Sequence, residues 1–179
     1  SNAFAQKDPE PIAKDDALVQ RLIALSKTTR SIAAAFTQEK YLSVLRDPLE
    51  SDGLFSYERP GRMRWEVTTP ERMVALVDHK SVRIFEKGNE QAVNAVDRQV
   101  YDAITDMIEG IISGSLLSGN SMKISYFKVS EGLLVIADPL DSRMAKRLKE
   151  VRLVFDKETL MLHELRMDQP NGDHTVTRF

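Results

Sequence analysis

Short runs of alternating apolar and polar residues constrain the fold of this chain more than any other feature. The clearest two read Phe-Ser-Tyr-Glu-Arg over residues 55–59 and Met-Arg-Trp-Glu-Val over residues 63–67. Pro60 and Gly61 stand between the runs, and both residue types are typical of tight turns. The pattern therefore predicts a β-hairpin made of two antiparallel strands.

This hairpin brings an arginine beside aromatic side chains. Side chains two positions apart in a strand point to the same face, so Phe55, Tyr57 and Arg59 point together. Met63 and Trp65 share a face of the second strand in the same way. Because a guanidinium that faces an apolar interior is costly without hydrogen-bond acceptors, we expect acceptors for Arg59 on that side of the sheet.

Similar runs recur along most of the chain, and they predict about ten short strands. The expected strands cover residues 36–45, 55–59, 63–67, 72–78, 81–87, 90–96, 122–130, 132–138, 150–156, 160–168 and 173–179. A loop over residues 47–53 is expected from its Asp-Pro and Asp-Gly pairs. Successive short strands form an antiparallel sheet, because a parallel pair needs a long crossover. Such a sheet must curl or close to protect its edges.

Two segments have helical spacing instead. In the first, leucines recur at i, i+4 and i+7 from Leu18 to Leu25, after a cap at Asp15-Asp16. The second segment covers residues 98–113 and carries one apolar stripe. The expected fold class is therefore α+β, with a curved antiparallel sheet covered by two amphipathic helices. The stripe consists of Ile104, Met107, Ile108, Ile111 and Ile112.

The composition is that of one soluble domain, which we place over residues 15–179. The chain has 179 residues, 42% hydrophobic and 29% charged, and no apolar run long enough to cross a bilayer. Its net charge of -2 gives no reason to expect a nucleic acid partner. Residues 1–14 are expected to be a flexible arm. Their first three, Ser-Asn-Ala, are typical of a cleaved tag, so any signal peptide is expected to have been removed.

No catalytic motif is apparent in the sequence. Residues 114–121 resemble a phosphate-binding loop, but Asn120 stands where lysine is required and the segment follows a helix. The three histidines are far apart, and the chain has no cysteine, which excludes a disulfide, a thiolate metal site and a cysteine nucleophile. We therefore expect neither enzymatic activity, nor a metal site, nor a cofactor.

Several motifs occur in an order that resembles the LolA-like periplasmic lipoprotein carriers. The resemblance extends over nearly the whole chain, and its most specific part is the Arg-Pro pair with a tryptophan five residues after the proline. Family members often have Asp-Gly where this chain has Asp78-His79, which alters only a turn. The matching residues are Phe36-Thr37-Gln38, Gly53-x-Phe55-x-Tyr57-x-Arg59-Pro60, Met63-x-Trp65-Glu66, Pro70-Glu71 and Asp78.

The resemblance implies an unclosed β-barrel that holds an apolar cavity beneath a lid made of helices. It implies that Arg59 is a latch, which hydrogen-bonds backbone carbonyls of the lid. The alternative for Arg59 is a surface salt bridge with Glu58 or Glu66, and the alternative for the cavity is a filled core. The expected cavity residues are Phe36, Phe55, Tyr57, Met63, Trp65, Ile104, Met107, Ile108 and Ile111.

The function implied by the resemblance is that of a monomeric periplasmic carrier. It would take acyl chains of lipoproteins or related lipids from an inner-membrane export complex and deliver them to an outer-membrane acceptor, without covalent chemistry. There are two alternatives: a lipid-sensing or regulatory binding module of the same fold, and a lipid-anchored acceptor. The chain ends at Phe179, before a further loop and strand of many family members, which favours a divergent branch with a different cargo.

A basic segment over residues 140–149 has two interpretations. Arg143, Lys146 and Arg147 are spaced at i, i+3 and i+4, so one helical turn would present them together. They would either dock on an acidic surface of a membrane partner or form an ordinary solvated surface.

Overall fold

The computed structural model describes residues 8–79, 81–95, 98–99, 101–102, 105–106, 109–110 and 122–179. Within these residues the chain forms twelve strands and two helices with defined bounds. The strands are β1 (Glu10–Ile12), β2 (Ser31–Tyr41), β3 (Leu49–Glu58), β4 (Arg62–Thr69), β5 (Met73–Asp78), β6 (Ser81–Glu86), β7 (Asn89–Gln91), β8 (Met122–Lys128), β9 (Gly132–Pro139), β10 (Glu150–Asp156), β11 (Leu162–Asp168) and β12 (His174–Arg178). The helices are α1 (Ala17–Thr28) and α3 (Ser142–Ala145).

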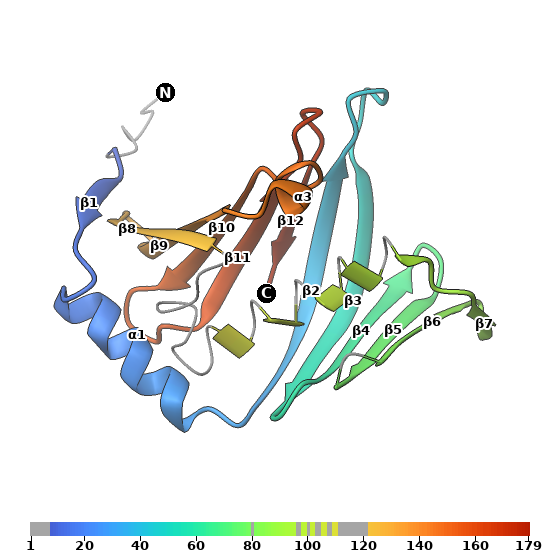
Figure 1. Ribbon diagram of the computed structural model, residues 1–179, viewed down its shortest axis with the longest axis horizontal. Helices are drawn as coiled ribbons and strands as arrows, with labels where there is room; N and C mark the ends of the chain where they lie inside the picture. Colours follow the sequence, from blue (N-terminus) through green and yellow to red (C-terminus); the bar gives the residue numbers. More distant parts are fainter. Residues whose placement is uncertain are drawn as a thin grey trace, which may run out of the picture.

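All twelve strands belong to one sheet, whose two halves are inclined to each other (Figure 1). Their order is β1-β8-β9-β10-β11-β12-β2-β3-β4-β5-β6-β7, and every neighbouring pair is antiparallel. The outer strands are β1 and β7, so the sheet curls without closing into a barrel. The predicted fold class, an α+β protein with a curved and unclosed antiparallel sheet, is confirmed.

The hairpin predicted from the two clearest alternating runs is formed by β3 and β4. Phe55 lies opposite Trp65, and Tyr57 lies opposite Met63, so the four side chains share one face of the sheet. The turn contains Gly61 at a φ of 65°, in the left-handed region that glycine enters without steric cost. The turn residue and the alternation therefore specify the same register.

The predicted bounds of the first strand and of the loop after it are wrong. The strand β2 begins at Ser31, five residues before the predicted start. The prediction missed its first half because the alanines of residues 33–35 have a low strand propensity. It ends at Tyr41, and residues 42–48 form the connection to β3. The predicted loop pair Asp52-Gly53 instead lies inside β3, where the register shifts.

The flexible arm predicted over residues 1–14 is wrong for Glu10–Ile12, which form β1 against β8. Pro9 and Pro11 argued against a strand, because proline cannot donate to a ladder. An outer strand tolerates proline because only one of its sides is paired, so this position in the sheet reconciles the prolines with strand structure.

The helix α1 is confirmed at the predicted place. The side chain of Asp16 caps it and accepts a hydrogen bond from the Leu18 amide at 2.9 Å. Lys128 of β8 approaches the same carboxylate to 3.0 Å, and both contacts hold the pKa of Asp16 below its ordinary value. Val19 is fully buried, so the apolar side of the helix packs on the sheet.

A second helical segment follows β7. The nine described residues between 95 and 110 are all helical, in agreement with the helix predicted from residue 98 onward. Figure 1 shows these turns, in yellow-green, in front of the sheet. We call these nine described residues the second helical segment.

Two apolar clusters occupy the covered face of the sheet. One packs under α1 and is built from β8, β9, β10 and β11, with Leu133 and Leu153 fully buried. The other is built from β2, β3, β4, β5 and β6. Phe179 packs against both clusters, so they belong to one face. The helix α1 therefore covers one half of the face, and the second helical segment contacts the other.

Candidate functional site

Aromatic side chains meet in the cluster of the β2–β6 half, which we call the aromatic cluster. The rings of Phe36 and Trp65 are 4.4 Å apart, and those of Phe55 and Trp65 are 5.6 Å apart. The Phe179 ring lies 6.4 Å from Phe36 and 6.2 Å from Phe55, with both pairs in edge-on geometry. Three neighbouring strands and the chain end thus supply one apolar surface.

A glycine makes this arrangement of rings possible. A Cβ atom at Gly53 would lie 2.4 Å from the Phe36 ring and 2.1 Å from the Glu66 carbonyl oxygen. Phe36 is opposite Gly53 in the β2–β3 ladder, so its ring lies across the glycine backbone. The glycine in the motif Gly-x-Phe-x-Tyr is therefore explained by packing.

The second helical segment contacts the aromatic cluster at intervals of one turn. Tyr101 packs against the cluster, and the Thr105 hydroxyl lies 4.0 Å from the Met63 sulfur. The Tyr57 hydroxyl donates to the Glu109 carboxylate at 3.2 Å. The three helical residues are spaced by four, so they form one face of the helix directed at β3 and β4.

The Tyr57 side of its contact with Glu109 is shielded from water. Tyr57 has only 2% of its surface exposed. Burial raises the pKa of the Tyr57 phenol, and the nearby Glu109 carboxylate raises it further. The phenol therefore stays protonated at neutral pH and remains a donor to the helical segment.

Arg59 lies at the end of β3, directly after this tyrosine strand. Its side chain is half-buried, and its amide donates to the Arg30 carbonyl at 2.9 Å, just before β2. The positive charge of Arg59 acts on the Tyr57 phenol and favours a lower pKa, opposite to the effect of Glu109. Arg59, Tyr57 and Glu109 thus lie at one junction between the sheet and the second helical segment.

The carboxylates named in the alternative for Arg59 are held by other arginines. Glu58 pairs with Arg62 at 3.3 Å, and Glu66 pairs with Arg64 at 2.7 Å. The choice between a latch and a surface salt bridge for Arg59 stays a prediction.

A family comparison matches this site and the sheet that carries it. The family model described as "Outer membrane lipoprotein carrier protein LolA" matches residues 27–179. The chain belongs to the LolA family. The match contains β2 and all strands from β3 to β12, and it begins near the end of α1.

Two curated members with the name outer-membrane lipoprotein carrier protein are similar to this chain. The protein from Dechloromonas aromatica is 29% identical over 111 residues, which cover 62% of this chain and 50% of the relative. The protein from Chromohalobacter salexigens is 26% identical over 161 residues, which cover 89% of this chain and 73% of the relative. The chain thus spans about half the length of the first relative and about three quarters of the second.

Solved structures of low sequence identity also align with the chain. A DUF1329 family protein from Desulfovibrio piger aligns with a TM-score of 0.48 at 7% identity and covers 90% of each chain. A LolA superfamily protein from Nitrosomonas europaea aligns with a TM-score of 0.43 at 8% identity, over 89% of this chain and 90% of that one.

The structure brings five of the predicted cavity residues together. Trp65 is half-buried, and the other four are buried in the same cluster. Ile104, Met107, Ile108 and Ile111 lie outside the described residues, and the cavity itself stays a prediction. The five residues that are brought together are Phe36, Phe55, Tyr57, Met63 and Trp65.

Sequence reasoning missed two groups of this LolA-family site. Phe179 ends the run His-Thr-Val-Thr-Arg-Phe, in which both faces of the strand carry polar residues. The pattern therefore did not show which face points to the interior. Thr105 and Glu109 lie on the helix face that contacts the sheet, although the apolar stripe predicted a different set. The spacing of Tyr101, Thr105 and Glu109 was the available signal.

A polar pocket lies beyond the aromatic cluster, near the end of β2. It has a volume of about 380 Å³ and is open to solvent, with Glu39, Glu50, Asp52 and Arg178 among its lining residues. Arg178 pairs with Glu39 at 2.6 Å. This pocket is too polar to be the predicted acyl-chain cavity.

Part of the predicted basic segment forms a helical turn, α3, which Asp141 caps through the amides of Arg143 and Met144, and Lys146 and Arg147 follow its end. Arg143, Lys146 and Arg147 are all exposed. Their role in docking stays a prediction.

In the part of the chain that the structure describes, no cluster of histidine, aspartate and glutamate has the arrangement of a metal site. None of the described helices combines the length and the apolar character that crossing a membrane requires.

Proposed function

We propose that this chain is a periplasmic carrier, which binds the acyl chains of lipoproteins or related lipids and delivers them to the outer membrane. One observation carries the proposal: in a member of the LolA family, an aromatic surface lies beneath a helical segment that a few polar contacts hold in place. Residues 15–179 would form the carrier domain, and the carrier would act as a monomer between an inner-membrane complex and an outer-membrane acceptor.

The chemistry of the cluster fits an acyl chain. Each methylene group that leaves water contributes about 0.8 kcal/mol, so two or three chains supply tight binding without a covalent bond. Rings and a methionine sulfur line the described part of the surface, and methionine adapts to irregular apolar ligands. Such binding requires no catalytic group, which is why we propose no enzymatic activity.

The second helical segment would act as the lid of the carrier. Lifting it would break the hydrogen bond between Tyr57 and Glu109 and separate Thr105 from Met63. Arg59 lies at the same junction and would act as the latch, donating to acceptors of the closed lid. A cargo that holds the lid open would keep these contacts between lid and sheet broken. The contacts that form again when the lid closes would therefore favour release of the cargo.

Fluorescence of Trp65 tests the carrier function, because it is the sole tryptophan of the chain. We expect a saturable change in its emission when a diacylated peptide is added, and no change with the same peptide without acyl chains. Phe55→Ala should weaken the response, whereas Phe85→Ala, outside the cluster, should not. No saturable response to the acylated peptide would overturn the proposal.

A further inference from the structure

The connection between β2 and β3 exposes apolar side chains at its tip. Val44 has 86% of its surface exposed, Leu45 has 45% and Leu49 has 50%. Figure 1 shows this hairpin projecting beyond β4, β5 and β6, beside the turn between β11 and β12. Exposed apolar side chains at a projecting tip are in contact with water, which is unfavourable unless a lipid phase or another molecule covers them.

The tip is held in a defined shape. The Leu45 amide donates to the Leu42 carbonyl at 2.9 Å and closes a turn. The Ser43 amide donates to the Asp173 carboxylate at 2.7 Å, in the turn between β11 and β12. These bonds brace the tip against a neighbouring hairpin, so its apolar side chains are presented by an ordered element.

Basic residues lie at the same end of the sheet. Figure 1 shows α3, the β11–β12 turn and the β2–β3 tip together at this end. The Lys149 amide donates to the Asp168 carbonyl at 2.7 Å, which ties the segment after α3 to the end of β11. Lys146, Arg147 and Lys149 are exposed, and among the described residues no carboxylate forms an ion pair with them.

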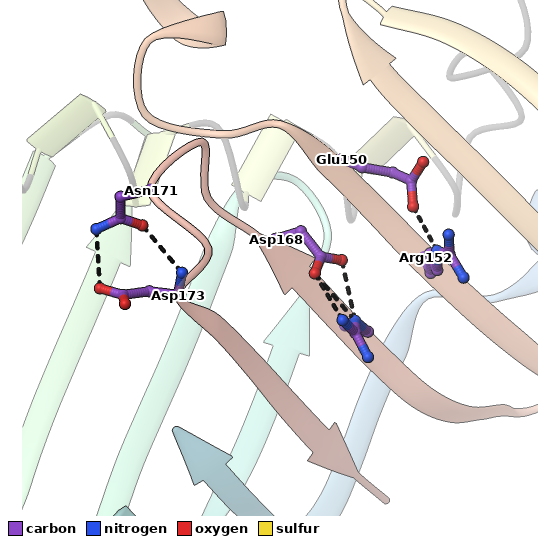
Figure 2. Close-up of polar contacts among 6 residues, drawn as sticks. Glu150, Arg152, Asp168, Asn171 and Asp173 are labelled. Atoms are coloured by element: carbon purple, nitrogen blue, oxygen red, sulfur yellow. Dashed lines mark hydrogen bonds and ion pairs between the residues drawn. The ribbon is translucent and has the colours of Figure 1, made fainter. Parts of the chain in front are cut away.

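Three carboxylates near these cations are already engaged, as Figure 2 shows. Glu150 bonds Arg152, and Asp168 accepts from Arg166 at 2.8 Å. Asp173 accepts from the Asn171 side chain at 2.9 Å, in addition to Ser43.

The segment around α3 is basic, in contrast with the whole molecule. Residues 140–150 contain four basic and two acidic side chains, a net charge of +2, whereas the whole chain has a net charge of -2. Leu140, with 60% of its surface exposed, adds an apolar side chain beside the cations.

We propose that this end of the molecule binds the surface of an anionic lipid bilayer. We call it the docking edge, and it consists of Val44, Leu45, Leu49 and Leu140 together with the cations of residues 143–149. The apolar tip would enter the region between the headgroups and the acyl chains, while the cations would contact anionic headgroups. The tip projects instead of forming a groove, which favours a lipid phase over a folded protein partner. The inference rests on surface residues alone, not on the proposed cavity.

Flotation with lipid vesicles tests the docking edge. We expect the protein to float with vesicles of phosphatidylglycerol and phosphatidylethanolamine, and to stay at the bottom with phosphatidylcholine alone. Replacing Val44 and Leu45 by serine should weaken the partitioning about tenfold. The matched control replaces Leu54 and Met161 by serine, two exposed apolar residues away from the edge, and should behave like the parent.

Charge reversal separates the contribution of the cations. Arg147→Glu should weaken binding to anionic vesicles several-fold, and added salt should have the same effect on the parent. Lys157→Glu makes the same change of charge in the β10–β11 turn, at the opposite end of β10, and should bind like the parent.

Two outcomes would overturn the docking edge. One is equal partitioning of the edge variants and their controls, and the other is a parent that binds neither vesicle type, as expected if a protein were the partner. Unfolding in urea checks that each variant is folded. Loss of the Trp65 response with intact flotation would reject the carrier function but not the docking edge.

Discussion

At Gly53 the backbone of β3, the Phe36 ring and the Glu66 carbonyl leave no room for a side chain. We expect Gly53→Ala to lower the free energy of unfolding by at least about 2 kcal/mol, because the ring and a neighbouring strand would both have to move. Urea unfolding measures the change. Gly88→Ala is the control, since a methyl group there meets nothing within 4 Å and carries only the cost of its φ of 85°. Equal losses for both variants would contradict the packing explanation.

Tyr126 is a second residue whose environment predicts a measurable effect. Its hydroxyl is buried under α1 and has no hydrogen-bond partner among the described residues. Burying such a group costs free energy, so Tyr126→Phe should raise the free energy of unfolding by about 1 kcal/mol at pH 8. A decrease would show that the hydroxyl has a partner in the folded protein.

The same residue also predicts a dependence on alkaline pH. Burial raises the pKa of Tyr126 from 10.0 to about 12, so the folded state keeps a proton that the unfolded chain releases near pH 10.0. The parent should therefore lose stability as the pH rises from about 10 to about 12. Tyr126→Phe should lose less over this interval, as urea unfolding at pH 9 and at pH 11 would show. If the free energy of unfolding of the variant falls as steeply as that of the parent, groups other than Tyr126 cause the loss.

At the scale of elements, the latch proposed for the junction between β3 and the second helical segment predicts an effect on the release of cargo. We expect Arg59→Leu to fold, to load lipid at least as well as the parent, and to transfer it more slowly. Removing charge-assisted hydrogen bonds of roughly 1.5 to 3 kcal/mol each would shift the balance toward the open, loaded state. Arg59→Lys should keep part of the transfer, since an ammonium group still donates hydrogen bonds.

The measurement for Arg59 is the rate of lipid transfer from loaded protein to acceptor membranes. Arg62→Leu is the matched control, because it removes an arginine of the same turn whose exposed pair with Glu58 is worth little. Equal transfer rates for the Arg59→Leu protein and its parent would reject the latch.

Elements were predictable where turn or cap residues agreed with the hydrophobic period. The β3–β4 hairpin and the cap of α1 at Asp16 have this agreement, and the structure confirms them. The strands β1 and β2 were misjudged because prolines and alanines have low strand propensity, which pairing in the sheet overrides. The strand residues of the aromatic cluster followed from the alternation of apolar and polar residues. The Tyr57–Glu109 contact joins residues 52 apart in sequence, and no local pattern specifies such a contact.

On the scale of the whole molecule, Phe179 connects the two apolar clusters. Its amide donates to the His163 carbonyl at 3.0 Å, and its ring packs against residues of both halves of the sheet. We expect Phe179→Ala to lower the free energy of unfolding by about 2 kcal/mol and to weaken acyl-chain binding, because the ring supports Phe36 and Phe55.

Phe85→Ala provides the comparison, since this half-buried ring lies outside both clusters and contacts Arg83 at 5.0 Å. It should cost less than the Phe179 variant and leave binding unchanged. Thermal unfolding and Trp65 fluorescence check the two effects. A larger loss for Phe85→Ala than for Phe179→Ala would contradict the proposed connection.

The open ends of the sheet have a consequence for the behaviour of the protein at high concentration. An unpaired strand edge is a template on which the strand of another molecule can add, which leads to aggregation. Both outer strands, β1 and β7, have only three residues, and β1 contains Pro11 and follows Pro9. Both edges are short, and Pro11 removes a donor from β1, so we expect them to be poor templates that do not join molecules into fibres.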